Sequence, residues 1–169
     1  AAQSSVGDSF KLPLQTAESG GMGALRIFDY ARHADHPCRV FQASSSEIFG
    51  DITDTHHSED SFFNPKTPYG ATKLFAHIMA EAYRASYGTY VSTGILFNHE
   101  SPLRGSNFVT KKITESMVAV KTGRLKSFSL GNLDARRDWS HAKDFVNAIW
   151  RLLQLDSPNN VVLASGTLT

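Results

Sequence analysis

Four side chains in the middle of the chain have the types and the spacing needed to move protons and to steer a hydride. Ser45 and Glu47 lie two residues apart, so they share one face wherever this segment is extended. Tyr69 and Lys73 lie four residues apart, so they stack on one face of a helix. The Lys73 ammonium would favour the phenolate of Tyr69 and lower the pKa of that phenol towards working pH. The four side chains therefore predict a catalytic centre for acid–base and hydride chemistry.

Each of these patterns is weak when it stands alone. Residues 44–46 also fit a polar strand end that enters a turn, and Glu47 also fits a solvated loop carboxylate. Context favours the catalytic interpretation, because the apolar pair Val40 and Phe41 leads into the serines and an amphipathic helical pattern carries Tyr69 and Lys73.

Composition bounds the class of protein. A chain of 169 residues forms one ordinary core, and 41% hydrophobic and 20% charged residues are globular values. A net charge of +1 without a block of like charge argues against nucleic acid or a membrane surface as a partner. Cys38 is the only cysteine, which excludes an internal disulfide and predicts a reducing, cytoplasmic location. The chain has no apolar run of about 18 residues and therefore predicts no membrane span.

The start of the chain resembles neither a secretory signal nor a natural beginning, because it has no initiator Met and no basic region before an apolar stretch. We therefore expect an internal fragment of a longer protein. The seven histidines predict no metal site: His33 and His36, with Cys38 nearby, lack a fourth ligand at zinc spacing.

Alternating helical and strand patterns predict an α/β fold with a parallel sheet. We expect helices at 10–35, 68–87, 108–122 and 139–155, and strands at 39–44, 90–97, 127–130 and 161–164, with loops at 51–66 and 98–105. Ligands of such sheets bind beyond the carboxyl ends of the strands. The segments 44–47 and 98–104 both follow strands directly, so they point to one crevice.

Two later segments are dense in functional groups. In the loop 98–105, Arg104 would grip a phosphate while Asn98 and His99 bond sugar or amide groups, although an ordinary surface loop fits as well. Near residue 137, Asp138 would cap the next helix and leave Arg137 to meet an anion. Lys111 and Lys112 would face either solvent or a diphosphate.

Glycines of a dinucleotide-binding loop are missing. No Gly-x-Gly-x-x-Gly opens a strand–helix unit, and the segment 20–23 (Gly-Gly-Met-Gly) lies inside a helical pattern without a strand before it. This absence weighs against cofactor binding by the chain alone.

Four stretches, at 41–50, 68–74, 94–105 and 130–139, resemble the extended short-chain dehydrogenase/reductase superfamily. Within it, the last two stretches are most similar to the GDP-mannose 4,6-dehydratase family. The resemblance implies a Rossmann-like, doubly wound parallel sheet, truncated at its N-terminus, with part of a smaller substrate-binding region. Residues 1–97 would be the C-terminal part of the dinucleotide-binding domain. Residues 98–169 would hold nucleotide-sugar-binding segments interleaved with the last Rossmann elements.

The resemblance implies an NADP-dependent lyase that converts GDP-mannose to GDP-4-keto-6-deoxy-mannose, cytoplasmic and homodimeric or homotetrameric. Tyr69 would take the proton of the C4 hydroxyl as hydride leaves C4, and Lys73 would hold the nicotinamide ribose. Glu47 would remove the C5 proton before water leaves C6. Ser45 stands where the family usually has a threonine, and both supply a hydroxyl for the C4 oxygen.

The resemblance also carries over binding residues. The cofactor-binding positions are Ala2, Gln3, Ser4, Tyr69, Lys73, His99 and Arg104, and the substrate-binding positions are Ser46, Glu47, Asn98, Lys111 and Arg137. Gln15 replaces a family tyrosine, Ser140 replaces a glycine, and the segment 34–39 is about two residues shorter. We expect the fragment alone to be inactive. A nucleotide-sugar epimerase or decarboxylase of the same superfamily, or a non-catalytic fragment, remains an alternative.

Overall fold

The core of the fold is a parallel three-stranded sheet. The computed structural model describes residues 2–50 and 56–168. Strands β1 (Val40–Ala43), β2 (Val91–Leu96) and β5 (Asn160–Leu163) lie in the order β1-β2-β5 and pair in parallel. Beyond their carboxyl ends, β3 (Asn98–Glu100) and β4 (Trp139–His141) form a short second parallel pair. The predicted α/β class is confirmed.

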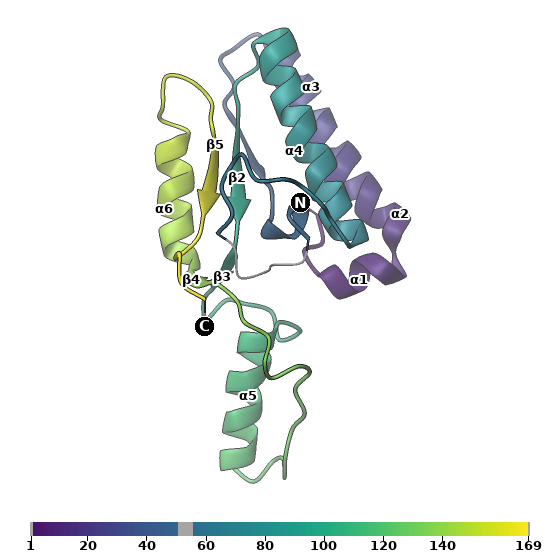
Figure 1. Ribbon diagram of the computed structural model, residues 1–169, viewed down its shortest axis with the longest axis vertical. Helices are drawn as coiled ribbons and strands as arrows, with labels where there is room; N and C mark the ends of the chain where they lie inside the picture. Colours follow the sequence, from purple (N-terminus) through teal and green to yellow (C-terminus); the bar gives the residue numbers. More distant parts are fainter. Residues whose placement is uncertain (1, 51–55, 169) are drawn as a thin grey trace.

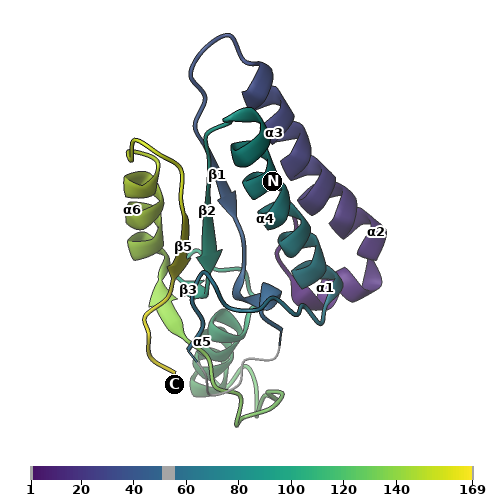
Figure 2. The same ribbon diagram turned by 45° about the horizontal axis from the view of Figure 1, so that its top comes forward.

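Helices flank the sheet on two sides (Figure 1). Helices α3 (Gly23–His33) and α4 (Pro68–Tyr87) run side by side on one side, and α6 (Ala142–Leu152) lies on the other (Figures 1 and 2). The N-terminal α1 (Val6–Lys11), α2 (Pro13–Thr16) and the π-helical turn η1 (Ala17–Met22) lead into α3. Helix α5 (Val109–Lys121) buries no residue and projects beyond the sheet.

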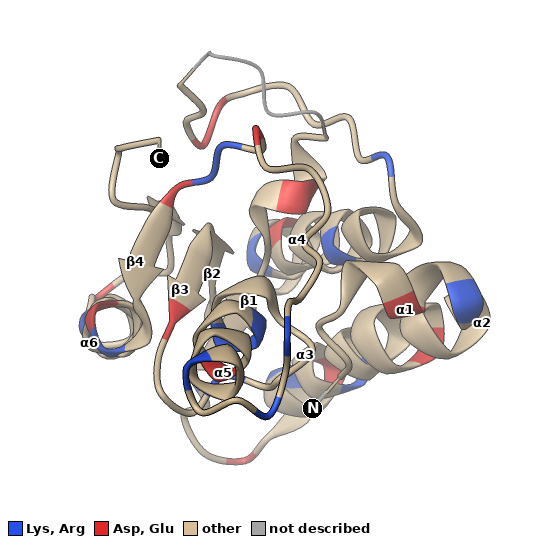
Figure 3. Ribbon diagram, turned by 90° about the horizontal axis from the view of Figure 1, so that it is seen from below, with Lys and Arg blue, Asp and Glu red and all other residues tan. Residues whose placement is uncertain are grey.

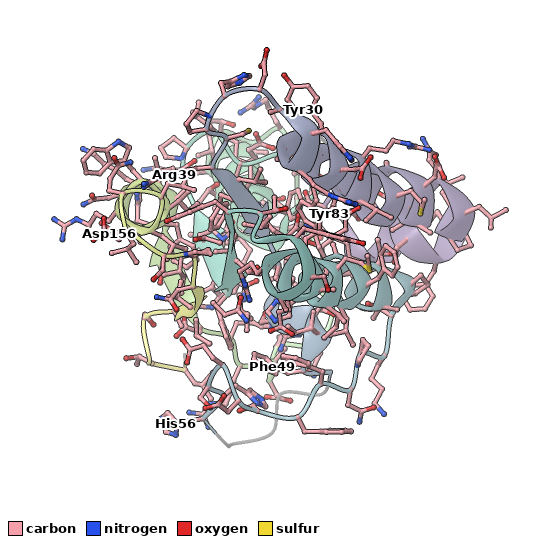
Figure 4. The ribbon with its side chains drawn as sticks, turned by 90° about the horizontal axis from the view of Figure 1, so that it is seen from above. Tyr30, Arg39, Phe49, His56, Tyr83 and Asp156 are labelled. Carbon is pink, nitrogen blue, oxygen red and sulfur yellow. The ribbon has the colours of Figure 1, made fainter. Side chains whose placement is uncertain are left out.

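Helix α4 has the bounds that its sequence predicts, and local signals explain them. The Thr67 side chain accepts the Gly70 N–H at the start, Pro68 occupies the first turn, and Gly88 ends the helix with a φ of +66°. Tyr83 lies where α3 and α4 meet and packs on Phe28 in the core (Figure 4). This packing holds α4 along the strands that end at the site.

Three predicted elements are wrong. The helix expected at 10–35 begins at Val6 and is interrupted by a break at Leu12 and by the wider η1 turn. The helix expected at 139–155 begins at Ala142, because residues 139–141 form β4 and pair with β3. Strand β3 itself lies within the segment 98–105 that was expected to be a loop. His141 caps α6. The strand expected at 127–130 does not form, since the segment lies beside the projecting α5, away from the sheet.

Charges are dispersed over the surface. Seen from below, Lys and Arg are spread over several helices and are interspersed with Asp and Glu (Figure 3). No helix among the described residues has the length and apolar character of a membrane span.

Ser9 of α1 joins this helix to the first turn of α4. The Ser9 side chain is fully buried, and its Oγ accepts the Tyr69 N–H at 3.2 Å while donating to the Val6 carbonyl at 2.6 Å. The first N–H groups of a helix have no partner inside the helix. Ser9 therefore supplies, from 60 residues away, an acceptor that α4 needs.

Glu81 and Arg84 of α4 bond the sheet, and the buried His77 lies next to Glu81. His77 is fully buried, with its Nε2 3.4 Å from Glu81 Oε1. Glu81 in turn accepts from Asn160 Nδ2 at 2.6 Å, and Arg84 donates to Asn160 Oδ1 at 2.9 Å and to the Val91 carbonyl at 2.8 Å. Burial lowers the pKa of His77 below 6.5 and outweighs the nearby Glu81 carboxylate, which raises this pKa.

Replacing Ser9 with Ala is expected to lower the free energy of unfolding by about 1–3 kcal/mol, because the Tyr69 N–H would stay buried without an acceptor. Urea unfolding measures this loss. Ser19→Ala is the control, since Ser19 is only partly buried and its hydroxyl donates to the Gln15 carbonyl one turn earlier in the same helical segment. An equal loss in the two variants would contradict the role given to Ser9.

The buried His77 predicts a loss of stability in mild acid. Its pKa is lower in the folded than in the unfolded state, so on acidification the unfolded state takes up the proton first. The free energy of unfolding should therefore decrease as the pH falls through about 6.5, by up to about 1.4 kcal/mol per pH unit. His77→Leu should reduce this slope in urea unfolding at pH 7.5 and 5.5. His36→Leu, at a side chain 61% exposed, is the control. An unchanged slope in His77→Leu would refute the assignment.

Candidate active site

The segment after β1 brings three serines and a carboxylate to the carboxyl end of the sheet. The Ser44 N–H donates to the Gly94 carbonyl at 2.8 Å and so prolongs the pairing with β2. Ser45 then caps the 3-10 turn η2 (Ser46–Ile48), its side chain accepting the Glu47 N–H. Ser45 is extended and Glu47 lies in the turn, yet both side chains line one cavity of about 420 Å³.

Lys73 connects α4 to the last residue of β1. Its Nζ donates to the Ala43 carbonyl at 2.8 Å and lies 5.5 Å from the centre of the Tyr69 ring. Both side chains line the same cavity as Ser45 and Glu47. Burial lowers the pKa of Lys73, because a charged amine loses its hydration there. The helix spacing thus brings the phenol and the amine to the end of the strand.

The pKa of Tyr69 is raised above its ordinary value near 10. Burial of the phenol is the main cause and the Glu47 carboxylate adds to it, whereas hydrogen bonding from Ser45 and the Arg104 charge oppose it. The predicted lowering of the Tyr69 pKa by Lys73 is therefore wrong: burial outweighs the two groups that lower this pKa, Ser45 and Arg104, and Lys73 is not one of them. The phenol is protonated at neutral pH.

Gly70 permits the close approach of η2 and α4. A Cβ at this position would lie 2.6 Å from the Glu47 carbonyl oxygen, closer than real Cβ atoms come to another heavy atom. Beneath this contact, Ile48 and Phe49 of the turn pack on Ile95 and Phe97 at the end of β2. The turn that carries Ser46 and Glu47 is therefore supported by apolar packing on β2 and Phe97, which also lines the cavity.

Asn98 and His99 of β3 and Arg104 of the loop that follows line the cavity, and each has a partner within the chain. Asn98 donates its amide to the Asp138 carbonyl at 3.2 Å. His99 stacks on Phe145, with its Nδ1 2.8 Å from the Phe97 carbonyl oxygen.

Arg104 is held from two sides. Its Nε lies 3.2 Å from a Glu100 carboxylate oxygen, and its guanidinium carbon lies 3.6 Å from the centre of the Phe108 ring. This places a cation on the cavity wall near Tyr69, whose pKa it lowers.

Other predicted site residues are divided between the cavity and the rest of the surface. Ser4 and Ser46 line the cavity. Among the described lining residues we do not find Ala2, Gln3, Lys111 or Arg137. Gln3 bonds Thr16 and the Ser5 N–H, Lys111 bonds the Pro102 carbonyl, and Arg137 bonds the Arg136 carbonyl.

Asp138 does not cap α6, contrary to the sequence prediction. Its buried carboxylate accepts the N–H groups of Ser165, Gly166 and Thr167 and the Ser165 hydroxyl, at 2.8–3.3 Å. These bonds attach the segment after β5 to the start of β4. Asp138 thereby helps to hold the start of β4 against the carboxyl end of the main sheet.

Sequence reasoning missed Asn107 and Phe108, which line the cavity from the turn before α5, and Ser9, which holds Tyr69. No spacing rule links residues so far apart in the chain. Within residues 2–50 and 56–168, no cluster of three or more His, Cys, Asp or Glu side chains is arranged to hold a metal ion.

Similar solved structures have the same fold. An RMD from Pseudomonas aeruginosa complexed with NADPH superimposes with a TM-score of 0.92 at 23% identity, covering 100% of this chain and 59% of that chain. DesIV, a dTDP-glucose 4,6-dehydratase from Streptomyces venezuelae with NAD bound, gives a TM-score of 0.87 at 22% identity, covering 100% and 51%. At these identities the similarity shows the fold, which is that of a Rossmann-like parallel sheet.

Proteins found by sequence comparison have a higher identity to this chain than these solved structures do. The human GDP-mannose 4,6 dehydratase is 46% identical over 167 residues, and that of Sinorhizobium fredii is 45% identical over 171 residues. The matches cover 98% and 100% of this chain but 45% and 49% of the relatives, so the chain spans about half their length. The sequence profile described as GDP-mannose 4,6 dehydratase matches residues 1–169. A match over the whole chain, with relatives at this identity, shows that the chain belongs to the GDP-mannose 4,6-dehydratase family.

Proposed function

We propose that the natural protein carrying this chain is a lyase that converts GDP-mannose to GDP-4-keto-6-deoxy-mannose with NADP. The observation that carries this proposal is the convergence of Ser45, Glu47, Tyr69 and Lys73 on one cavity at the carboxyl end of the sheet. Membership of the family supports it. The same set of groups is what a reaction needs when it oxidises C4, removes the C5 proton and expels the C6 hydroxyl.

The cavity suits the reactive end of the cofactor. Its volume of about 420 Å³ is typical of small-molecule sites. The Lys73 ammonium has three donors and uses one on Ala43, so two can bond ribose hydroxyls. When bound, NADP would supply the acceptor and donor of the hydride. We further propose that Ser4, His99 and Arg104 contact the cofactor from the cavity wall. Ala2 and Gln3, outside it, would contact more distant parts.

Tyr69 and Ser45 act at C4 in this proposal. The Ser45 hydroxyl bonds the C4 oxygen, and Tyr69 takes the C4 hydroxyl proton as hydride leaves C4. Burial raises the pKa of Tyr69 further above neutral pH, so the resting phenol is protonated. The phenol must therefore lose its proton before it can act as a base, and the positive charge of Arg104 favours that loss.

Glu47 acts at C5. Once C4 is a ketone, the C5 proton is acidic, and a half-buried carboxylate in the same cavity is suited to remove it. Ser46 and Asn98 line the cavity and would bind the sugar. Lys111 and Arg137 lie outside the cavity, and the proposal assigns them to the diphosphate end of the substrate.

The same proposal includes the organisation of the protein. Residues 1–97 belong to the dinucleotide-binding domain, and residues 98–169 carry nucleotide-sugar-binding segments between the last Rossmann elements. The return of β5 and α6 to the main sheet supports this interleaving. We also propose a homodimer or homotetramer in the cytoplasm.

Two substitutions should separate the chemical roles in the natural protein. Glu47→Gln removes the C5 base but leaves Tyr69, so GDP-mannose should still reduce part of the bound NADP before the reaction stalls. Product formation should fall about 10²-fold or more, the usual effect of losing a positioned base. Tyr69→Phe should abolish cofactor reduction. Absorbance of the reduced cofactor and exchange of deuterium into C5 are measured together.

Exposed residues of the same types provide the controls. Glu18→Gln and Tyr30→Phe change side chains on the N-terminal helices that are 59% and 62% exposed, and both should retain parental activity. Deuterium exchange at the parental rate in Glu47→Gln would show that another group is the base. Full hydride transfer in Tyr69→Phe would refute the role of that phenol.

A further inference from the structure

The π-helical turn η1 lies directly against α4 at two glycines. A Cβ placed on Gly20 would lie 2.9 Å from Thr72 Cγ2, and one on Gly21 would lie 3.2 Å from Phe75 Cδ1. The first distance is one that real side chains essentially never show, so something would have to shift. Thr72 is buried, with 9% of its surface exposed, and has little room to give way.

Neither glycine is needed for its backbone conformation. The glycines with positive φ among the described residues are Gly50, Gly88, Gly123 and Gly166, and Gly20 and Gly21 are not among them. Glycine also lowers helix stability relative to alanine. What Gly20 contributes is therefore the missing side chain, and the Thr72 methyl occupies the space left free.

Thr72 lies between the two α4 residues of the site. It directly precedes Lys73, and it follows Tyr69 by three residues, slightly less than one helical turn. The Ser9 bond to the Tyr69 N–H and the Lys73 bond to the Ala43 carbonyl fix α4 at points on either side of Thr72. A displacement at Thr72 would therefore be transmitted to the phenol and the amine.

We propose that Gly20 and Thr72 form a positioning contact that sets where α4 places Tyr69 and Lys73 in the cavity. Neither residue is in the set that lines this cavity, so the contact acts through the helix and not on a ligand. The effect on turnover rests on the proposed function, whereas the effect on the position of Tyr69 does not.

The test compares Gly20→Ala, Thr72→Ala and the double variant with the parent. The reporter is the 13C NMR resonance of the Tyr69 phenol carbon in tyrosine-labelled chain, assigned by its loss in Tyr69→Phe. Gly20→Ala should shift this resonance, and the added Thr72→Ala should return it towards the parental position, because removing Cγ2 makes room for the new Cβ. Gly23→Ala is the matched control, since its Cβ would meet only the Glu18 carbonyl oxygen at 3.7 Å.

Turnover of GDP-mannose by the same variants of the natural protein is the second readout. Gly20→Ala should lower kcat about 10-fold with little change in KM, since misplacement of about 1 Å costs up to about 10²-fold. The double variant should recover most of this loss. If the contact had only a structural role, Gly20→Ala would lower the stability of the protein, but kcat would not fall and then recover in the double variant.

Each outcome decides the proposal. An unmoved Tyr69 resonance in Gly20→Ala, or a shift that the double variant does not reverse, overturns it. If Gly20→Ala does not fold, the double variant decides: a folded chain with the parental resonance supports the contact, and any other result overturns it. A resonance that moves and recovers in a protein without dehydratase activity would sustain the positioning contact and refute the proposed function. Parental activity with an unmoved Tyr69 resonance would sustain the proposed function and refute the positioning contact.

Discussion

The hydrogen bond from the Lys73 ammonium to the Ala43 carbonyl is the interaction on which the rest of the site depends. It joins the helix that carries the phenol to the end of the strand that leads into the serines, at 2.8 Å. A buried ammonium is costly unless it is bonded, as the lowered pKa of Lys73 reflects. With this bond in place, α4 is held in a position in which Tyr69 faces Ser45 and shares a cavity with Glu47.

The packing around α4 maintains that geometry. Gly70 lets the first turn of α4 lie against the Glu47 backbone, and Ser9 accepts the otherwise unpaired Tyr69 N–H. Ile48 and Phe49, which follow the serines in the chain, pack on Ile95 and Phe97. The chemistry of the site is thus carried by a few polar atoms whose positions are set by residues without any chemical role.

Local patterns predicted α4 and the convergence of Ser45, Glu47, Tyr69 and Lys73 because the relevant signals lie close together in the sequence. The spacing of Tyr69 and Lys73, Pro68 at the start and Gly88 at the end are all properties of one segment. The three-residue strands β3 and β4 could not be predicted, since each is formed only by pairing with the other across about 40 residues. The bonds of Asp138 to the segment after β5 depend on the same kind of long-range contact. The direction in which the Tyr69 pKa shifts was also not predicted, because burial decides it and not the lysine one turn away.

The proposed dehydration requires the hydride that leaves C4 of the sugar to be returned to C6 once water has left, because only this return restores the oxidised cofactor and yields the 6-deoxy product. This return is tested most directly by GDP-mannose carrying deuterium at C4, incubated with the natural protein and NADP. The proposed dehydratase predicts a 4-keto-6-deoxy product in which the deuterium has moved to C6. Deuterium returned to C4 would indicate an epimerase of the same fold, and deuterium left on the released cofactor would indicate a simple dehydrogenase. Either result would contradict the account.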